Sequence, residues 1–474
     1  MARICRLRGK GRGGALTWAV LVSWLCLAGQ IRIANAEEPA ANVEAPRPSV
    51  FTVIVTRHGV RSPTKFLGGE YTWPRWDPVR DAFLTKHGYQ LMTLMGAFYG
   101  EPVLGAPVDC GKVFVYADKD QRTYLTAQAL LAGLCRPGTI GPIYHEPDVT
   151  AADPIFNGAK WVGKRINFSD SSNAIKAVAG DPPSKIVTSH AEDFAIFQRL
   201  LETRCPSRNC APIERGDSAI QPTKEGLAEL GGPLNTASYS EDLFLEYAQC
   251  RAIAQIAPGN DEDTLKVYLN AGLRLHVLAY QVNARNAYNP LVRGGTLLGH
   301  IVGMLDMKAA RPNVLNVVTP AEVKDKALVI LSGHDTQLGA LGGILGAHWS
   351  PGGGVAPDDM PPGSALIIDL LKTPTGYGVQ LRFASMTVDQ FRNNGRISKD
   401  SIRLMPVTGS LCNSAQCVVP LEQFEGLALK LQAKQLVDRD WRLSNAGLQF
   451  PTLNDPGDDP KNPNPDWKDA ECKP

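Results

Sequence analysis

The chain has 474 residues, of which 44% are hydrophobic and 20% are charged. This balance excludes a disordered tail protein and a small disulfide-knotted protein, because both classes have very different compositions. A formal charge of +2 gives no indication of a nucleic-acid-binding protein. The length and the apolar content are sufficient for a large core, with chain enough for two or three domains.

The first 36 residues have the three parts of a secretory signal. Five basic residues and no acid lie within residues 1–14, an apolar stretch follows at Ala15–Gly29, and Ala34-Asn35-Ala36 forms a small-x-small cleavage pattern. A membrane anchor is the competing interpretation, but this stretch is shorter than the ~20 residues of a spanning helix. We therefore expect cleavage after about Ala36, export to the periplasm or the medium, and a mature chain without a membrane span.

Cleavage changes the charge and the cysteine count. Residues 1–36 contain six basic residues and no acid, so their removal takes the formal charge from +2 to −4. Eight cysteines remain, and an even number in an exported protein favours disulfides. Two pairs lie five residues apart and could close small loops, Cys205 with Cys210 and Cys412 with Cys417, although these four could instead bind zinc. We also expect bonds between Cys110 and Cys135 and, by elimination, between Cys250 and Cys472.

After a lead-in at residues 37–48, strands and helices alternate. Ser49–Thr56 is a β-branched apolar run without alternation, which is typical of a strand buried on both faces of a parallel sheet. A second such run, Val113–Ala117, lies between helical patterns at Asp81–Tyr99 and Thr123–Leu134. This alternation predicts an α/β domain with a mostly parallel central sheet flanked by helices.

Residues 151–324 have a different pattern, and we expect them to form a mostly helical inserted lobe. Strong strand runs are rare there, whereas Glu241–Ile256 and Asp263–Val282 have apolar residues at helical spacing. The α/β domain would then comprise residues 49–150 and 325–450. Its remaining strands are expected at Ala327–Leu331, Ala365–Leu370 and Tyr377–Phe383, and the proline-rich residues 451–474 predict an extended tail.

Polar clusters follow the three strongest strands, each at the point where the strand ends. Thr56–Lys65 (TRHGVRSPTK) follows the first, Asp118–Thr123 (DKDQRT) the second, and Ser332–Thr336 (SGHDT) the third. In an open parallel sheet, ligands bind outside the carboxyl ends of the strands. We therefore expect the three clusters to meet at one edge and to supply two histidines, three arginines and an aspartate to one site.

These residue types suit phosphoryl transfer. Arginine forks match a tetrahedral oxyanion such as phosphate or sulfate, and they can stabilise its charge without a metal. His58 lies between Arg57 and Arg61, and nearby cations disfavour an imidazolium, so a neutral, nucleophilic imidazole is expected. Asp335, at the third strand end, is the candidate general acid for the departing alkoxide.

Each cluster also has a purely structural interpretation. An Arg-His pair is usually a surface or capping feature, and a His-Asp pair after a strand often caps a helix. Gly59 and Gly333 could be turn residues only. The coincidence of three clusters at three strand ends favours a site over these alternatives.

Two motifs resemble those of a known family. Arg57-His58-Gly59-x-Arg61-x-Pro63, with a distant His334-Asp335, resembles the signature pair of the histidine acid phosphatases, the extracytoplasmic branch of the phosphoglycerate-mutase-like superfamily. The likeness runs from about Val53 to Cys472. Within the family, the bacterial periplasmic phytases are most similar, through four matches: Arg57–Lys65, Leu84–Gly88, Ala117–Thr123 and Gly333–Thr336.

Carried over by matching position, the resemblance implies that His58 becomes phosphohistidine and that Asp335 protonates the leaving oxygen. Four residues would hold the phosphate: Arg57, Arg61, Arg122 and His334. Three would contact the substrate beyond it: Thr64, Lys65 and Arg293. Acidic substrate-facing positions fall near Glu241 and Asp242, and no metal or cofactor is implied. The other histidines receive no role; His276 could line the site from the helical lobe, but a core position is expected for it.

The sequence thus predicts an acid phosphatase for small phosphomonoesters, with inositol hexakisphosphate as the expected substrate because Lys65 and Arg293 add cations for a polyanion. A glucose-1-phosphatase or a broad-specificity acid phosphatase is the alternative, although the glucose-1-phosphatases usually carry Asn where Gly59 stands. A phosphate-ester binding protein without turnover and a metal-dependent phosphatase are further alternatives, and the chain has no H-E-x-x-H motif for the latter. One departure from the phytase pattern is Gln337, which replaces the usual Asn.

Overall fold

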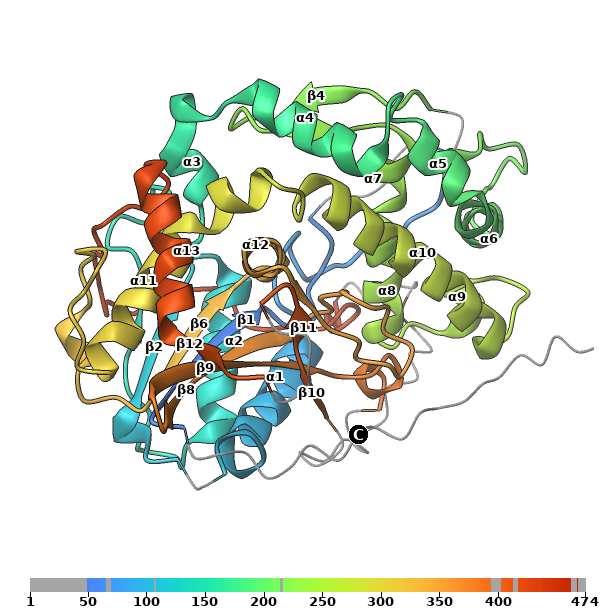
Figure 1. The fold of residues 1–474 in the computed structure, drawn as a ribbon. Coiled ribbons are helices and arrows are strands. Elements are labelled where there is room, and N and C mark those ends of the chain that lie inside the picture. The colour runs from blue at the N-terminus through green and yellow to red at the C-terminus, as the bar shows by residue number, and fades with distance from the viewer. Residues whose placement is uncertain are drawn as a thin grey trace, which may run out of the picture. The chain divides into compact units, whose positions relative to one another are not determined.

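A central β-sheet collects the apolar runs of the sequence in the computed structural model (Figure 1). The structure describes residues 49–64, 70–105, 108–213, 216–393, 402–411, 417–461 and 467. In order across the sheet, the strands are β10 (Arg403–Pro406), β9 (Gly376–Ser385), β8 (Ala365–Thr373), β1 (Phe51–Arg57), β6 (Leu328–Gly333), β2 (Val113–Ala117) and β3 (Ile143–Tyr144). A further strand, β12 (Val419–Pro420), pairs with β9.

The parallel half of the sheet contains the three strands that carry the polar clusters. β1 and β2 both pair in parallel with β6, which lies between them. Arg57 is in register with Gly333, and Ala117 is in register with Ser332, so the three strands end at one level. Every residue of β1, β2 and β6 is buried, which explains why these runs are apolar without alternation.

The sheet is mixed rather than mostly parallel, which corrects that part of the expectation. β8 is antiparallel to β1, and β9 is antiparallel to β8. Only Pro374 and Thr375 separate β8 from β9. A connection this short can join only antiparallel neighbours, because parallel strands need a crossover of a dozen or more residues. The α/β class itself is confirmed.

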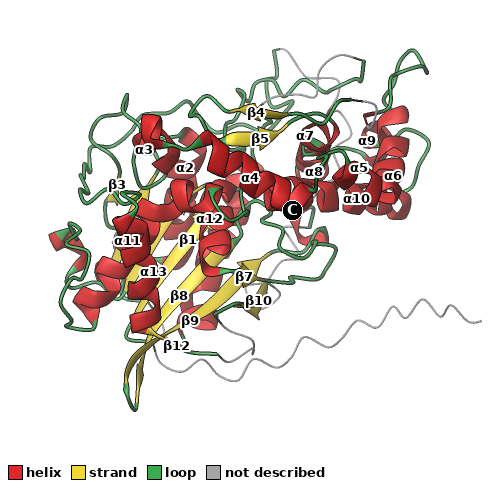
Figure 2. Cartoon of the chain, turned by 45° about the horizontal axis from the view of Figure 1, so that its top comes forward, coloured by secondary structure: helices red, strands yellow, loops and turns green. Residues whose placement is uncertain are grey.

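Helices cover both faces of the sheet (Figure 2). On one face, α1 (Lys86–Phe98) and α2 (Gln121–Leu134) pack against each other and join the cluster that contains Ile54 of β1. On the other face, α11 (Asn289–Lys308), α12 (Asp335–Leu345) and α13 (Leu421–Ala433) join the cluster that contains Val53 and Val55. Alternate residues of β1 therefore serve two separate core layers.

The helical insertion is present. Its central helix is α10 (Glu262–Asn283), which packs against α6 (Ala191–Glu202), α8 (Ser240–Ala248) and α7 (Pro233–Ala237). Its helices, at the top and right of Figure 1, are α4 (Phe168–Ala179), α5 (Lys185–Ser189), α6 (Ala191–Glu202), α7 (Pro233–Ala237), α8 (Ser240–Ala248), α9 (Ile253–Ile256) and α10 (Glu262–Asn283). Shorter elements are the hairpin β4 (Ile220–Pro222) and β5 (Ala228–Leu230), α3 (Gly158–Val162), and the pair β7 (Ala347–His348) and β11 (Thr408–Gly409). We call the region from α4 to α10 the helical lobe.

Three boundaries differ from the sequence pattern. The helix expected at Asp81–Tyr99 begins only at Lys86, where the Thr85 side chain caps it by accepting from the Gly88 amide. The helix expected at Glu241–Ile256 is interrupted between α8 and α9, where Cys250 has a φ of 64°. α11 falls within the range expected for the insertion but packs against α12 and the sheet. The remaining domain limits stay a prediction.

Two of the expected disulfides are confirmed, Cys110–Cys135 and Cys205–Cys210. Cys250 and Cys417 are also disulfide-bonded, and their expected partners, Cys472 and Cys412, lie outside the described residues. The expected signal at residues 1–36 lies outside them as well.

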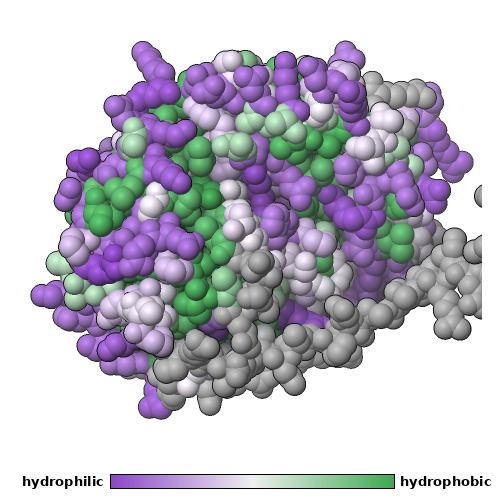
Figure 3. Space-filling model, viewed as in Figure 1, coloured by the Kyte–Doolittle hydropathy of each residue, from purple (hydrophilic) through white to green (hydrophobic). Residues whose placement is uncertain are grey.

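The end of the described chain lies against the α/β domain without regular structure. The Asn454 carbonyl accepts from the Lys86 amide at 3.1 Å, and the Trp467 ring packs against Trp76 with centroids 5.1 Å apart. Among the described helices, none combines the length and apolar character needed to cross a membrane. The face of the molecule seen in Figure 3 is largely hydrophilic, with hydrophobic patches between the polar residues.

Candidate functional site

The three polar clusters meet at the carboxyl ends of β1, β2 and β6, as the sequence predicts. Backbone bonds hold the strand ends together: the His58 amide donates to the Gly333 carbonyl, and the Asp118 amide donates to the Ser332 carbonyl, both at 3.0 Å. The rings of His58 and His334 consequently lie with their centroids 5.5 Å apart. A cavity of about 740 Å³ opens at this edge, lined by both histidines and by residues of the helical lobe.

Two glycines allow α1 to lie directly against the first cluster. A Cβ on Gly59 would lie 2.6 Å from the Met92 side chain, and a Cβ on Gly88 would lie 2.1 Å from the Val60 carbonyl oxygen. Side chains at these positions would push the helix and the cluster apart. The Leu84–Gly88 motif is thus a packing motif that fixes the backbone around His58, and Gly59 is more than a turn residue.

His58 is buried and neutral, with one nitrogen available for chemistry. Its Nδ1 lies 3.0 Å from the Gly59 carbonyl oxygen, and since a carbonyl can only accept, Nδ1 carries the hydrogen. Nε2 therefore carries the lone pair. Burial lowers the pKa of His58 well below its usual value, and the cations Arg122, Arg61 and Arg57 lower it further. The imidazole stays unprotonated in acid, as a nucleophile requires.

Buried guanidinium groups with unused hydrogen-bonding capacity surround this histidine. Among the described residues, Nε has no hydrogen-bond partner in four arginines that line or border the cavity: Arg57, Arg61, Arg122 and Arg293. Arg57 is only 1% exposed. Four guanidinium groups with spare donors around one cavity indicate a site for an anion.

The Glu241 carboxylate, from the first turn of α8, partly occupies that anion site. One of its oxygens accepts from Arg57 Nη2, and the other accepts from Arg61 Nη2 at 3.2 Å. Burial opposes ionisation of Glu241, but the two arginines outweigh it and lower its pKa. A phosphate that engages both arginines would displace this carboxylate.

Asp335, at the start of α12, contacts the same Arg57 nitrogen as Glu241. Its Oδ2 is 2.9 Å from Arg57 Nη2, and its Oδ1 accepts from the Thr336 hydroxyl at 3.3 Å. Burial would raise the pKa of Asp335, but Arg57 and a hydrogen bond from Tyr280 hold it well below its usual value. The carboxyl is thus ionised before substrate binds.

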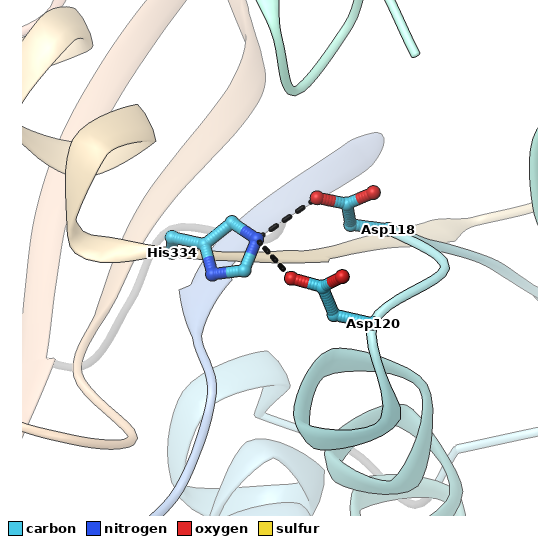
Figure 4. A group of neighbouring side chains, drawn as sticks. All are labelled: Asp118, Asp120 and His334. Atoms are coloured by element: carbon cyan, nitrogen blue, oxygen red, sulfur yellow. Dashed lines mark hydrogen bonds and ion pairs between the residues drawn. The ribbon is translucent and has the colours of Figure 1, made fainter. Parts of the chain in front are cut away.

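His334 lies beside Asp118 and Asp120 (Figure 4), and Arg122 contacts its other ring nitrogen. Its Nε2–H donates to Asp118 Oδ2 at 2.8 Å, which leaves Nδ1 as an acceptor for Arg122 Nη2 at 3.4 Å. Asp120 Oδ2 lies 3.8 Å from the same Nε2 and 2.6 Å from Arg122 Nη2. Burial lowers the pKa of Arg122, although Asp120 and Asp118 oppose this shift.

Asp118, Asp120 and His334 could also hold a metal ion, because one ligand atom of each lies within 4.8 Å of the others. An ion at this point would have to replace the Nε2 hydrogen of His334 and lie beside the Arg122 guanidinium. The arrangement suits a hydrogen-bonded support for His334 better than a cation site.

Gln337, the departure from the phytase pattern, forms hydrogen bonds to backbone groups and does not line the cavity. Its side-chain oxygen accepts from the His334 amide at 2.8 Å, and its amide nitrogen donates to the Phe156 carbonyl at 2.7 Å. A Cβ on Gly333 would lie 2.9 Å from the Gln337 side-chain oxygen and 2.9 Å from the Phe156 ring. Gln337 therefore fixes the first turn of α12, on which His334 and Asp335 lie.

The substrate-contact residues expected beyond the phosphate are partly placed. Thr64 and Arg293 line the cavity, whereas Lys65 lies outside the described residues. Burial lowers the pKa of Arg293, although nearby acidic groups oppose this shift.

The lobe contributes residues to which the sequence gave no role or only an approximate place. His276 and Tyr280 of α10 line the cavity, so the core position expected for His276 is wrong. Glu241 and Asp242, which the sequence placed only approximately, line it too, and burial and Glu241 raise the pKa of Asp242 to about 8. A possible signal for the α10 pair was the four-residue spacing of His276 and Tyr280, which places both on one helix face.

No family model matches the chain. A search of curated proteins finds "Phytase AppA" of Escherichia coli (strain K12), 27% identical over 408 residues that cover 80% of this chain and 90% of the relative. It also finds a glucose-1-phosphatase of Providencia rettgeri, 30% identical over 118 residues, but the match covers only 22% of this chain and 28% of that protein.

Solved structures of bacterial phytases have a fold similar to that of this chain. The phytase of Hafnia alvei is 26% identical, and the alignment covers 82% of this chain and 98% of that chain. The TM-score is 0.71 for its complex with tartrate and 0.69 for its complex with myo-inositol hexakis sulphate. By sequence and by fold, the chain is similar to bacterial phytases, the phytase-like members of the histidine acid phosphatase family.

Proposed function

We propose that this protein is an acid phosphatase of the phytase type, which hydrolyses phosphomonoesters through a phosphohistidine at His58. The observation that carries the proposal is the neutral, buried His58, whose free Nε2 is surrounded by arginines with unused donors. Such a group attacks an electrophile that is itself an anion, and phosphate fits both requirements.

In the first step, the scissile phosphate binds to Arg57, Arg61 and Arg122. It also binds to His334, whose Nδ1 is an acceptor in the free protein and takes up a proton in order to donate to the phosphate. The Nε2 lone pair of His58 forms a bond to phosphorus while the bond from phosphorus to the ester oxygen breaks. Asp335 gives its proton to the departing alkoxide. The arginines stabilise the charge on the three equatorial oxygens without themselves changing protonation state.

In the second step, the Asp335 carboxylate accepts a proton from water, whose oxygen attacks phosphorus and breaks the bond to Nε2. Inorganic phosphate leaves, and Asp335 releases this proton to solvent until the next substrate binds. Bound substrate makes protonation of Asp335 possible, because its phosphate dianion engages Arg57 and adds negative charge beside Asp335. Both effects raise the pKa of the carboxyl relative to the free protein.

We propose myo-inositol hexakisphosphate as the substrate, since the cavity is large and Arg293 adds a cation away from the scissile phosphate. The relatives named phytases support this choice over its alternatives. A glucose-1-phosphatase is the second candidate, favoured only by the short match to the Providencia rettgeri protein. Comparison of kcat/KM on the two substrates distinguishes them.

We also propose that residues 1–36 are an export signal and that the enzyme acts in the periplasm or the medium. Two observations support this proposal: the basic, apolar and small-x-small pattern of these residues, and the disulfides of the folded chain. Disulfides form and persist in oxidising compartments.

Replacement of the nucleophile tests the proposed function. We expect purified wild-type protein to release phosphate from p-nitrophenyl phosphate and from phytate at acidic pH, and we expect the His58→Ala variant to lose at least 10³-fold in kcat, roughly as loss of a nucleophile does in other hydrolases. The matched control is His348→Ala, because His348 is exposed and does not line the cavity.

Two results would contradict the proposal. Substantial activity in His58→Ala would exclude the covalent step. A wild-type protein that binds phosphate esters without turnover would be a binding protein rather than an enzyme.

A further inference from the structure

Residues 150–160, which lead from β3 into α3, form a wall of the cavity. Five of them line it: Thr150, Ala151, Ala152, Asn157 and Lys160. Lys119, two residues after the end of β2, lines the cavity as well. The family resemblance gives no role to Lys119 or Lys160. We call residues 150–160 together with Lys119 the lysine wall.

Contacts to the sheet and to α12 fix the lysine wall in place. The Tyr116 hydroxyl of β2 donates to Asp153 Oδ2 at 2.7 Å, and the Tyr116 ring stacks on Phe156 with centroids 5.7 Å apart. The Phe156 carbonyl also accepts from the side-chain nitrogen of Gln337, in α12, at 2.7 Å. Because these contacts already order the backbone, binding of a ligand to this wall costs little further ordering of the chain.

Lys160 lies on α3, next to the start of α11. A Cβ on Gly158 would lie 2.7 Å from the Arg293 carbonyl oxygen, so α3 lies directly against α11. Lys160 and Arg293 both line the cavity, and the Lys160 side chain is exposed. The close packing of α3 on α11 therefore brings two cations to neighbouring parts of the cavity lining.

Lys119 connects the lysine wall to the phosphate site. Its ammonium group donates to the Ala151 carbonyl, and its backbone amide donates to Asp118 Oδ1 at 2.9 Å. The other oxygen of Asp118 accepts from His334, which is expected to hold the scissile phosphate. An ammonium group has three hydrogens to donate, so two remain for an anion beside that site.

The charges of the two lysines are available to a ligand. Within the part of the chain that the structure describes, neither lysine forms an ion pair. The arginines around His58 differ in this respect, because Arg57 and Arg61 pair with Glu241, and Arg122 pairs with Asp120. No carboxylate in contact with the lysine wall has to be displaced before an anion binds there.

The helical lobe has the opposite charge where it lines the cavity. Its carboxyl groups there are Glu229 of β5 and Glu241 and Asp242 of α8, and no lysine or arginine from the described residues of the lobe lines the cavity. Phosphate groups are attracted by ammonium groups and repelled by carboxylates. The phosphates of a polyanionic substrate should therefore lie against the lysine wall rather than against the lobe.

We propose that Lys119 and Lys160 are specificity-determining residues, which bind phosphate groups of the substrate other than the group transferred to His58. The inference rests on the proposed function and names the part of the cavity that distinguishes a polyphosphate from a monophosphate. A monophosphate engages the arginines around His58 and leaves both lysines without an anion. A polyphosphate adds charge-assisted hydrogen bonds to both.

Two measurements test the inference. The first is the Kd of myo-inositol hexakis sulphate, measured by isothermal titration calorimetry for wild type, Lys119→Gln, Lys160→Gln and the double variant. We expect Kd to rise by about 5–10-fold in each single variant and by roughly 25–100-fold in the double variant. The second is steady-state kinetics, in which the ratio of kcat/KM for phytate to kcat/KM for p-nitrophenyl phosphate should fall by similar factors.

Lys164→Gln is the matched control, because Lys164 follows Lys160 by four residues, is exposed and does not line the cavity. This control should leave Kd and the kinetic ratio unchanged. Lys160→Arg keeps the cation, so its Kd should stay within about twofold of the wild-type value. Thermal unfolding shows whether each variant is folded.

Three results would overturn the inference: a double variant that binds the hexakis sulphate as tightly as wild type, a wild-type protein that does not bind it, or equal losses of kcat/KM on both substrates. Equal losses would assign the lysines to the scissile phosphate or to the fold. A wild-type protein that binds the hexakis sulphate but hydrolyses no phosphomonoester would refute the proposed function alone, because the Kd measurement does not depend on turnover.

Discussion

The electrostatics of single residues assign opposite protonation states to the two reacting groups. Burial and three arginines keep His58 neutral, whereas Arg57 and Tyr280 keep Asp335 ionised in the free protein. In the free protein, His58 can therefore act as a nucleophile, but Asp335 has no proton to donate. The proton on Asp335 must therefore appear together with substrate, when the phosphate dianion engages Arg57, and activity should fall as pH rises through the pKa of Asp335 in that complex.

The acid role of Asp335 predicts a dependence on the leaving group. In Asp335→Asn the side chain keeps its size but has no proton to transfer. We expect kcat/KM for phytate or glycerol 2-phosphate to fall by roughly 10²–10⁴-fold and the value for p-nitrophenyl phosphate to change far less. Equal losses on all three substrates would show that Asp335 contributes to binding or to folding rather than to proton transfer.

At the scale of an element, the first turn of α12 carries both candidate catalytic residues and the side chain that fixes its backbone. His334 caps this helix and Asp335 begins it, while Gln337 bonds both the His334 amide and the Phe156 carbonyl. The sequence identified Gln337 only as a departure whose effect on the cavity was open. The structure shows instead a longer amide that connects α12 to the segment before α3.

This connection predicts the effect of Gln337→Ala. The substitution leaves a buried amide and a buried carbonyl without partners, so the free energy of unfolding should fall by about 1–3 kcal/mol. Because the first turn of α12 also loses its cap, kcat should decrease as well. Chemical denaturation and steady-state kinetics measure the two effects. Gln380→Ala is a control, because Gln380 is half-buried in β9 and does not line the cavity. An unchanged denaturation midpoint in Gln337→Ala would contradict this account.

Element positions were predictable where hydrophobic patterns determine them. The uninterrupted runs at β1, β2 and β6 predicted buried strands because both faces of the sheet are covered. Strand direction was not predictable in the same way, and β8 and β9 proved antiparallel because two residues connect them. The break between α8 and α9 escaped prediction too, since the positive φ of Cys250 has no signal in an apolar pattern.

At the scale of the whole molecule, the site draws on distant parts of the chain. The contribution of the sheet could be predicted, because parallel strands end at one edge and the polar clusters mark those ends. The contribution of the lobe could be predicted only in part. The family resemblance placed acidic positions near Glu241 and Asp242, but an amphipathic helix does not show which of its neighbours its polar residues will meet. Glu241, His276 and Tyr280 enter the cavity through the packing of α8 and α10.

The charge distribution also sets the cavity apart from the rest of the molecule. Without residues 1–36 the chain has a formal charge of −4, so its net charge would repel a polyphosphate. Attraction must come from the local field of the cavity, where Arg57, Arg61, Arg122 and Arg293 are concentrated. The near-neutral composition of the full chain conceals this separation of charge.

The most direct test of the central claim is to trap the phosphoenzyme. Wild-type protein is mixed rapidly with p-nitrophenyl phosphate, denatured in alkali to protect an acid-labile phosphohistidine, digested and analysed by mass spectrometry. We predict one phosphoryl group on the peptide that contains His58, its formation in Asp335→Asn as well, and its absence from His58→Ala. A wild-type protein that turns over substrate with no phosphoryl group on His58, or with one on another residue, would contradict the account.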